Sequence, residues 1–326
     1  MPRILLVASF PVDQFLRQTP EGGGVWGDFH FTGDPHRGPF DAVVVYDDCP
    51  GGVECEAIGR NTLLITGEPP SLRRYRRPFT SQFEHVWTSH RSIRHPQVRY
   101  GHEGQPWHYG LYPSQVHGRQ MTFSDLASLR APQKTKLCSV ICSSKTTTED
   151  HRQRLEFVRR LQREFGEQID VFGRGIRPLK DKSDAIYLYK YHVVMENDHS
   201  PFYMTEKLTD AFLGWSYPFY FGGREAEFCF PPGSYTAIDI YRPEVAIGII
   251  RDAMAQGTYE RQFPILGQAR SKVLQELNLM AMLAEFWQNA WQPGDYRPIR
   301  LLPKRRSAAL AWRHVQRSVT RPGRAA

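Results

Sequence analysis

The chain has 326 residues, a formal net charge of +8, and 40% hydrophobic and 13% aromatic residues. This length accommodates two domains of ordinary size, and this apolar content excludes a disordered chain. No apolar run approaches the roughly 18 residues that cross a membrane as a helix, so we expect a soluble or peripheral protein rather than an integral one.

The N-terminal part alternates short runs rich in Val, Ile and Leu with polar loops, which is the pattern of buried parallel strands. The runs predict strands over 4–8, 42–46, 62–66 and 85–88. The sequence T-G-E-P-P follows the third run and places Glu68 at the carboxyl end of a strand. From the residues alone, Glu68 is either a functional carboxylate or a surface glutamate in a turn.

Trp107, His108 and Tyr109 form an aromatic cluster shortly before a linker that we place at 131–136. Such a cluster either stacks on a sugar or packs in the core, and both interpretations stay open. The spacing of the nearby histidines matches no standard zinc site. The linker predicts an N-terminal domain of residues 1–130 and a C-terminal domain of residues 131–300, followed by a basic tail of residues 301–326.

The second half predicts a regular succession of strands and helices. The strands are expected over 137–142, 169–172, 193–195 and 217–221, and the helices over 149–165, 205–215, 244–256 and 259–291. This alternation indicates a parallel sheet with right-handed crossovers. The fold class is therefore α/β, with two Rossmann-like domains facing a cleft.

The most specific stretch runs from Tyr191 to Lys207 and reads Y-H-V-V-M-E-N-D-H-S-P-F-Y-M-T-E-K. A buried strand breaks into a polar loop, and a helix opens near Thr205. Ligands of open α/β sheets bind where a strand ends and a helix begins. The free N–H groups of the helix start and the Lys207 ammonium suit an anion such as the diphosphate of a nucleotide.

This stretch, with E-N, a tyrosine six residues on and then T-E-K, resembles the donor-binding signature of glycosyltransferase family 10, the α1,3/α1,4-fucosyltransferases of bacterial type. The P-P-G-S-Y sequence at 231–235 is similar to another segment of that family. The resemblance covers about 137–250, and 66–69 locally. It implies a GT-B fold in which residues 1–130 bind the acceptor and residues 131–300 bind the donor.

The resemblance also implies a role for each site residue. Glu68 matches the family's general base, and Arg154 matches an arginine that binds phosphate, although Arg152, Arg159 and Arg160 share its helix and an offset of one or two positions stays open. The remaining residues implied to bind the donor are Asn197, Tyr203, Glu206 and Lys207. No D-x-D sequence occurs, so we expect no obligatory metal and no cofactor beyond the donor substrate.

The resemblance implies an inverting transferase that moves L-fucose from GDP-fucose to a glycan such as lipopolysaccharide. The sequence has no zinc-finger spacing or RNA-binding signature, so we expect no nucleic-acid partner. Another GDP-sugar as donor, or a non-catalytic protein that binds a nucleotide sugar or glycan, stays open. Five scattered cysteines without C-x-x-C spacing are typical of a reduced, cytoplasmic protein. The basic tail carries an amphipathic pattern over 308–319, which either docks at the inner membrane or folds back on the N-terminal domain.

Overall fold

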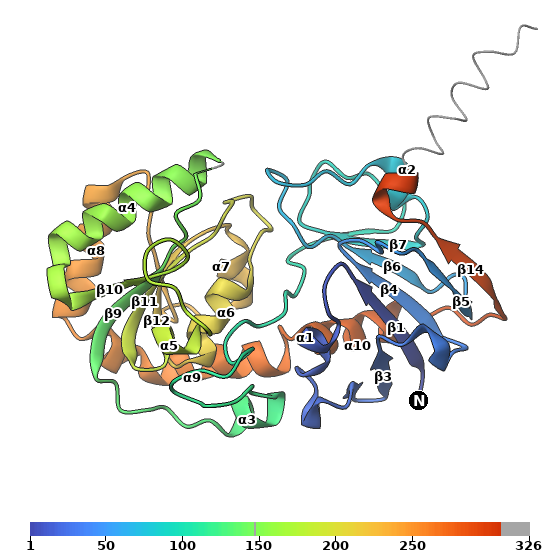
Figure 1. Cartoon of the computed structure of the whole chain (residues 1–326), viewed down its shortest axis with the longest axis horizontal. Helices are drawn as coiled ribbons and strands as arrows, with labels where there is room; N and C mark the ends of the chain where they lie inside the picture. Colours follow the sequence, from blue (N-terminus) through green and yellow to red (C-terminus); the bar gives the residue numbers. More distant parts are fainter. Residues whose placement is uncertain (147, 308–326) are drawn as a thin grey trace, which may run out of the picture. The chain divides into compact units, whose positions relative to one another are not determined.

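The computed structural model describes residues 1–146 and 148–307, and the chain folds into two compact units (Figure 1). Of the described residues, unit 1 comprises Met1–Asp13, Val25–Glu103 and 284–307, and unit 2 comprises Gln14–Gly24 and Gly104–Leu283. Each unit has its own parallel sheet, so the predicted α/β class with two Rossmann-like domains is confirmed. The cleft between them stays a prediction.

Unit 1 is built on a seven-stranded sheet in the order β2-β3-β1-β4-β6-β7-β8. All neighbours pair in parallel except β2 and β3, which form a hairpin. The four predicted strands are present within one residue of their expected ends. The bounds are β1 (Arg3–Ala8), β2 (Val25–Trp26), β3 (Phe29–Thr32), β4 (Ala42–Tyr46), β6 (Thr62–Ile65), β7 (His85–Thr88) and β8 (Val98–Tyr100).

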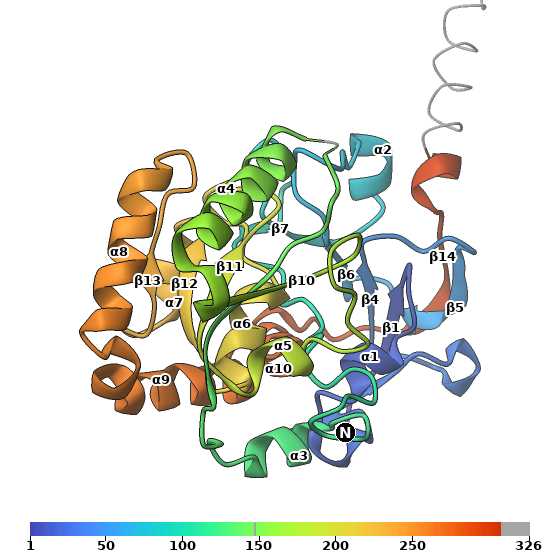
Figure 2. The same cartoon turned by 60° about the vertical axis from the view of Figure 1, so that its left-hand side comes forward.

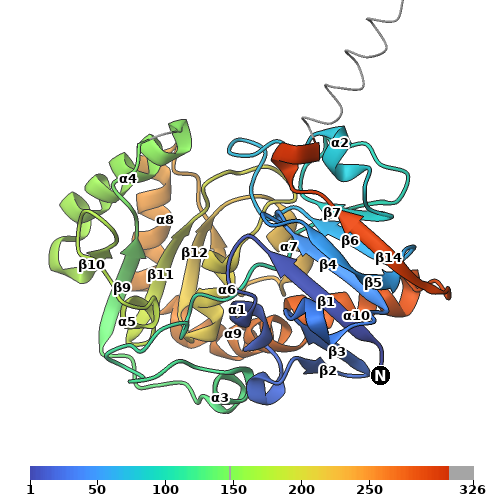
Figure 3. The same ribbon diagram turned by 45° about the vertical axis from the view of Figure 1, so that its right-hand side comes forward.

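A second, two-stranded sheet of unit 1 was not predicted. Strand β14 (Tyr296–Leu301) pairs antiparallel with β5 (Val53–Ile58), as Figure 3 shows. The short helices of this unit are α2 (Arg77–Thr80) and the 3-10 turn η2 (Pro35–Arg37), while α1 (Asp13–Leu16) crosses into unit 2. The apolar side chains of β5 and β14 cover the main sheet and enclose a core with Leu5, Val43, Val45, Leu64 and Phe79.

Unit 2 has a five-stranded, all-parallel sheet in the order β10-β9-β11-β12-β13. Its strands are β9 (Lys136–Ile141), β10 (Ile169–Phe172), β11 (Tyr189–Met195), β12 (Tyr217–Phe221) and β13 (Thr236–Ala237). The chain first adds β10 on one side of β9 and then returns to add β11 on the other side. The carboxyl ends of β9 and β11 therefore flank the switch point at which such sheets bind ligands.

The helices of unit 2 pack in pairs: α4 lies beside α8, and α6 packs on α9 (Figures 1 and 2). The start of α4 is capped by Thr148, whose hydroxyl accepts the N–H of His151. The bounds are η1 (Pro20–Gly22), α3 (Phe123–Ser128), α4 (Glu149–Phe165), η3 (Gly166–Gln168), α5 (Ser183–Ile186), α6 (Glu206–Leu213), α7 (Glu225–Cys229), α8 (Pro243–Ala255) and α9 (Thr258–Gln275).

The single helix predicted over 259–291 is wrong, because the chain breaks between α9 and α10 (Leu279–Ala290). The side chain of Asn278 accepts the N–H of Met280 at 3.0 Å and donates to the carbonyl of Gln18 at 2.6 Å. This side chain starts a new helix that begins in unit 2 and ends in unit 1.

The compact units divide the chain at other positions than the predicted boundaries. Residues 104–130, expected with the N-terminal domain, lie in unit 2, and residues 284–307 lie in unit 1. The physical reason for the first difference is Asp210 on α6, whose Oδ1 accepts the backbone N–H groups of His108 and Tyr109 at 3.0 and 2.9 Å. Which unit binds the acceptor and which the donor stays a prediction.

Within the described residues, no helix is both long and apolar enough to cross a membrane. Most of the predicted basic tail, residues 308–326 with the amphipathic pattern, lies outside the described residues. Membrane contact through the tail stays a prediction.

Candidate active site

A cavity of about 190 Å³ opens in unit 2 at the carboxyl ends of β9 and β11. Its walls include Arg154 from α4, Asn197 from the loop after β11, and Glu206 and Lys207 from the first turn of α6. The structure thus brings four of the five predicted donor-binding residues to one cavity, at the switch point of the sheet.

The loop between β11 and α6 is held by Glu196, which is fully buried. Its carboxylate accepts the N–H and the hydroxyl of Thr205 at 2.8 and 2.6 Å. It also lies 3.2 Å from the ammonium of Lys207. A carboxylate with these partners fixes the start of α6 against the end of β11, so the cavity walls are preorganised.

Arg154 is a buried cation with only 5% of its surface exposed. Its guanidinium donates to Asn197 Oδ1 and, at 3.4 Å, to the carbonyl oxygen of Glu196. Among the described residues, no carboxylate forms an ion pair with it. Burying a charge without a counter-charge is costly, so this arrangement suits an anionic ligand.

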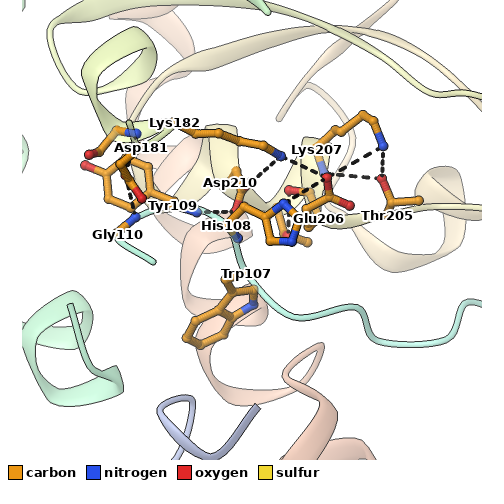
Figure 4. Close-up of polar contacts among 12 residues, drawn as sticks. Trp107, His108, Tyr109, Gly110, Asp181, Lys182, Thr205, Glu206, Lys207 and Asp210 are labelled. Carbon is orange, nitrogen blue, oxygen red and sulfur yellow. Dashed lines mark hydrogen bonds and ion pairs between the residues drawn. The ribbon is translucent and has the colours of Figure 1, made fainter. Parts of the chain in front are cut away.

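Glu206 lies between two ammonium groups, as Figure 4 shows. Its Oε1 is 2.8 Å from Nζ of Lys182 and 3.6 Å from Nζ of Lys207. Burial raises the pKa of Glu206, but the two lysines and His108 outweigh burial and hold the pKa well below its usual value. An ionised carboxylate only accepts hydrogen bonds, so its natural partners in a ligand are hydroxyl groups.

Three further residues complete this cluster (Figure 4): Lys182 and Asp210, to which the sequence did not point, and His108, which it gave only as part of the aromatic cluster. Lys182 bridges Glu206 and Asp210 at 2.8 Å each, and the Nδ1 of His108 lies 3.6 Å from Glu206 Oε1. Asp210 follows Glu206 by four residues, a helical spacing that puts both carboxylates on one face of α6. That spacing was the one available sequence signal, because Lys182 and His108 come from distant segments.

The aromatic cluster before the predicted linker turns out to be mostly core. Trp107 and Tyr109 are 1% and 0% exposed, whereas the side chain of His108 is 41% exposed. The core-packing interpretation therefore holds for Trp107 and Tyr109, and only His108 reaches the site.

Tyr203 is buried and does not line the cavity. Its N–H donates to the carbonyl of Ser200, and a Cβ atom at Gly223 would come within 2.7 Å of the Tyr203 carbonyl. The tyrosine thus belongs to a tight loop that packs on Gly223. Direct contact of Tyr203 with the donor stays a prediction.

Glu68 lies in unit 1, in the loop that follows β6, and is partly buried. Its N–H donates to Tyr75 Oη at 3.4 Å, and its carbonyl accepts from His90 Nε2 at 2.7 Å. A carbonyl only accepts, so this contact requires the tautomer with the proton on Nε2. The role of Glu68 as the base stays a prediction.

A second carboxyl group lies beneath this loop and was not singled out from the sequence. Glu103 is fully buried, and its Oε1 accepts the hydroxyl of Thr66 at 2.9 Å and the N–H of Ser89 at 2.8 Å. Burial raises the pKa of Glu103 to about 8, although both hydrogen bonds act in the opposite direction. The group therefore carries a proton through much of the neutral range.

In the P-P-G-S-Y segment, Ser234 is fully buried and its N–H donates to the carbonyl of Pro231. The five cysteines are free thiols in the described chain. The described residues contain no group of three His, Cys, Asp or Glu side chains placed to hold a metal ion. Whether the reaction needs a metal stays a prediction.

Residues 131–248 match the family model described as glycosyltransferase family 10 (fucosyltransferase), C-terminal part. None of the curated proteins matches the chain. Among solved structures, an α1,3-fucosyltransferase with GDP-fucose is 14% identical, with 90% of this chain and 92% of that chain covered and a TM-score of 0.48.

Two further solved structures have similar coverage. The α1,3-fucosyltransferase with GDP is 14% identical over 90% of this chain and 91% of that chain, at a TM-score of 0.47. A DNA-modifying β-glucosyltransferase is 8% identical, with 88% of this chain and 99% of that chain covered, at a TM-score of 0.44.

Proposed function

Through residues 131–248 the chain belongs to glycosyltransferase family 10, and from this membership we propose that it transfers L-fucose from GDP-fucose to a hydroxyl of a glycan acceptor. It is a glycosyltransferase. We propose in addition which sugar it transfers, that the reaction inverts the anomeric configuration, and which residues carry it out. The solved α1,3-fucosyltransferase structures with GDP-fucose and with GDP suggest the donor.

The single observation that carries the donor assignment is the buried Arg154 without a carboxylate partner in the described chain. It shares its cavity with Lys207 and with the amide of Asn197. A guanidinium makes two parallel hydrogen bonds to phosphate oxygens, and an ammonium adds a point charge. These groups accordingly hold the diphosphate of the donor and stabilise the negative charge that grows on it during transfer.

Glu206 supports the sugar-nucleotide class of ligand. Its ionised carboxylate lines the same cavity and accepts hydrogen bonds from hydroxyls of the ribose or of the transferred sugar. The cavity thus combines cations for a diphosphate with an acceptor for hydroxyl groups, which is the combination that a nucleotide sugar requires.

In the proposed reaction, Glu68 takes the proton of the acceptor hydroxyl. The oxygen attacks the anomeric carbon in one displacement, and the bond from that carbon to the phosphate oxygen breaks. GDP leaves with the bonding electron pair, and Arg154 and Lys207 stabilise it. A single displacement inverts the configuration at the anomeric carbon.

The proposal is tested by isothermal titration of the full chain with GDP-fucose, GDP-mannose, GDP and UDP. We expect guanine nucleotides to bind, GDP-fucose more tightly than GDP-mannose, and EDTA to leave the affinities unchanged. Equal binding of the two GDP-sugars would contradict fucose as the donor sugar and would favour another GDP-sugar as the donor. No binding of any GDP species would overturn the function.

The acceptor and the membrane contact are tested separately. Incubation of GDP-fucose with cell-surface glycan fractions, including lipopolysaccharide, identifies the product by mass. Flotation with vesicles of anionic lipid compares the full chain with a chain that ends after Ser307, because Lys304 belongs to the folded part of unit 1. Glu68→Gln is expected to abolish transfer while donor binding persists; unchanged transfer would refute Glu68 as the base.

A further inference from the structure

The hydroxyl of Tyr75 uses all of its hydrogen-bonding capacity at one place in unit 1. It donates to Asp47 Oδ1 at 2.5 Å and accepts the backbone N–H groups of Gly67 and Glu68 at 3.2 and 3.4 Å. A phenol has one proton and two lone pairs, so its orientation is determined by these three partners. Tyr75 is 7% exposed, so water does not replace them easily.

Asp47, in turn, is fixed by groups from three other segments. Its carboxylate accepts Lys304 Nζ at 2.8 Å and the Ser9 hydroxyl at 3.0 Å, and Arg73 lies 3.9 Å away. Burial raises the pKa of Asp47, but the bonds from Lys304 and Tyr75 outweigh burial and lower it. Asp47 is therefore an ionised, 4% exposed acceptor for the Tyr75 proton.

His90 holds the other polar backbone group of Glu68. Its ring donates to the Glu68 carbonyl at 2.7 Å and packs edge-on against the Tyr75 ring, with centroids 5.1 Å apart. Both the N–H and the carbonyl of Glu68 are thus bonded by buried side chains. No regular secondary structure supplies these bonds, so the side chains determine where the loop lies.

Lys304 reaches Asp47 because the segment after β14 is tied to unit 1. The side chain of Gln82 bonds both polar backbone groups of Leu302, and Asp48 accepts the N–H of Lys304 at 3.0 Å. The Lys304 ammonium also lies 4.8 Å from the centre of the Tyr75 ring. The lysine is 15% exposed in its side chain, unlike its neighbour Arg305, which is exposed.

We infer that Tyr75 and His90 are positioning residues for Glu68, and that Lys304, from the C-terminal segment, fixes Tyr75 through Asp47. The inference rests on the proposed role of Glu68 as the base. A small displacement of a reacting group lowers a rate by as much as about a hundredfold. The C-terminal segment is thus part of the machinery that sets the geometry of the base.

The first test measures hydrogen exchange of the backbone in the loop 66–71 of the full chain. Lys304→Met is compared with Arg305→Met, which removes the same charge one residue away from an exposed side chain. We expect faster loop exchange in Lys304→Met and in Tyr75→Phe, and wild-type exchange in Arg305→Met. Unchanged exchange in both Lys304→Met and Tyr75→Phe overturns the inference.

The second test separates positioning from general stability. Turnover is followed as GDP release from GDP-fucose, with water and with a cell-surface glycan extract as acceptors. We expect His90→Phe to lower kcat at least about tenfold with an unchanged KM for GDP-fucose. His90→Gln, whose amide nitrogen occupies nearly the position of Nε2 and still donates, is expected to recover most of kcat. Equal kcat in both His90 variants overturns the inference.

Failure of the underlying function looks different. If Glu68→Gln turns over like the wild type, the base assignment falls, whatever the loop exchange shows. If Glu68→Gln is inactive and the His90 variants and Lys304→Met match the wild type, the base stands and the positioning role falls.

Discussion

Replacing Arg154 by methionine should separate ligand affinity from stability. The substitution keeps most of the apolar stem and removes the charge. In the complex that we propose, the guanidinium makes charge-assisted hydrogen bonds to the donor's phosphate oxygens, and such bonds contribute about 2–3 kcal/mol when buried. We therefore expect GDP-fucose and GDP to bind about 30- to 150-fold more weakly.

Without the donor, the same substitution should cost little. Arg154 loses its bonds to Asn197 and to a backbone carbonyl, but the chain no longer buries a cation without a carboxylate partner in the described residues. These two effects oppose each other, so the free energy of unfolding should change by less than about 1 kcal/mol. Chemical denaturation of the free protein measures it.

The matched control is Arg160→Met on the same helix. Arg160 pairs with Glu156 at 3.3 Å and Glu244 at 2.6 Å, and its side chain is 38% exposed, so both affinity and stability should stay near wild type. Two results would refute the reasoning. One is an unchanged dissociation constant in Arg154→Met, and the other is a loss of several kcal/mol in the free protein, which would make Arg154 a structural residue.

Three further outcomes are expected. Glu103 has a folded pKa of about 8 against an ordinary value of 4.5, so its contribution to stability is complete below pH 4.5 and is lost as the pH rises through 8. Glu103→Gln cannot ionise, and its stability relative to wild type should rise between pH 5 and 8 by up to about 4 kcal/mol, measured by urea denaturation; a constant difference would contradict this. Lys182→Met leaves the buried carboxylates of Glu206 and Asp210 without their shared cation and should lower the free energy of unfolding by about 3–5 kcal/mol. Lys180→Met, at an exposed site, should lower it by almost nothing when both variants are compared by thermal unfolding. Gly223→Ala puts a Cβ atom 2.2 Å from the backbone carbonyl of Ser200 in the cavity loop and should weaken GDP binding. The control Gly248→Ala in α8, where a Cβ atom meets nothing within 4 Å, should add about 0.5–1 kcal/mol to the free energy of unfolding. A Gly223 variant with wild-type affinity for GDP would show that the loop is not rigid.

The strands and helices that the sequence predicted well share a local signal. Strand β4 is an unbroken run of buried residues, and α4 has an apolar face together with a threonine cap. Strand β5 was missed because V-E-C-E-A-I carries two glutamates, and its partner β14 lies more than two hundred residues away. The break before α10 has no proline or glycine, since the Asn278 side chain makes it.

The same contrast applies to the candidate site. Asn197, Glu206 and Lys207 share one strand-to-helix connection, so a local motif was sufficient to group them. Lys182 and His108 reach Glu206 from other segments, and their spacing in the chain carries no trace of this contact. Residues that act through another residue, as we infer for Tyr75 and Lys304, are similarly invisible in a single sequence.

The path of the chain has a practical consequence for protein engineering. The chain passes from one compact unit to the other four times, after Asp13, Gly24, Glu103 and Leu283. A chimera that exchanges one unit for that of a relative therefore needs four junctions rather than one. A fragment that stops at Glu103 lacks both α10 and β14, so it does not contain a complete unit 1, and a contiguous half of the chain cannot be grafted as one unit.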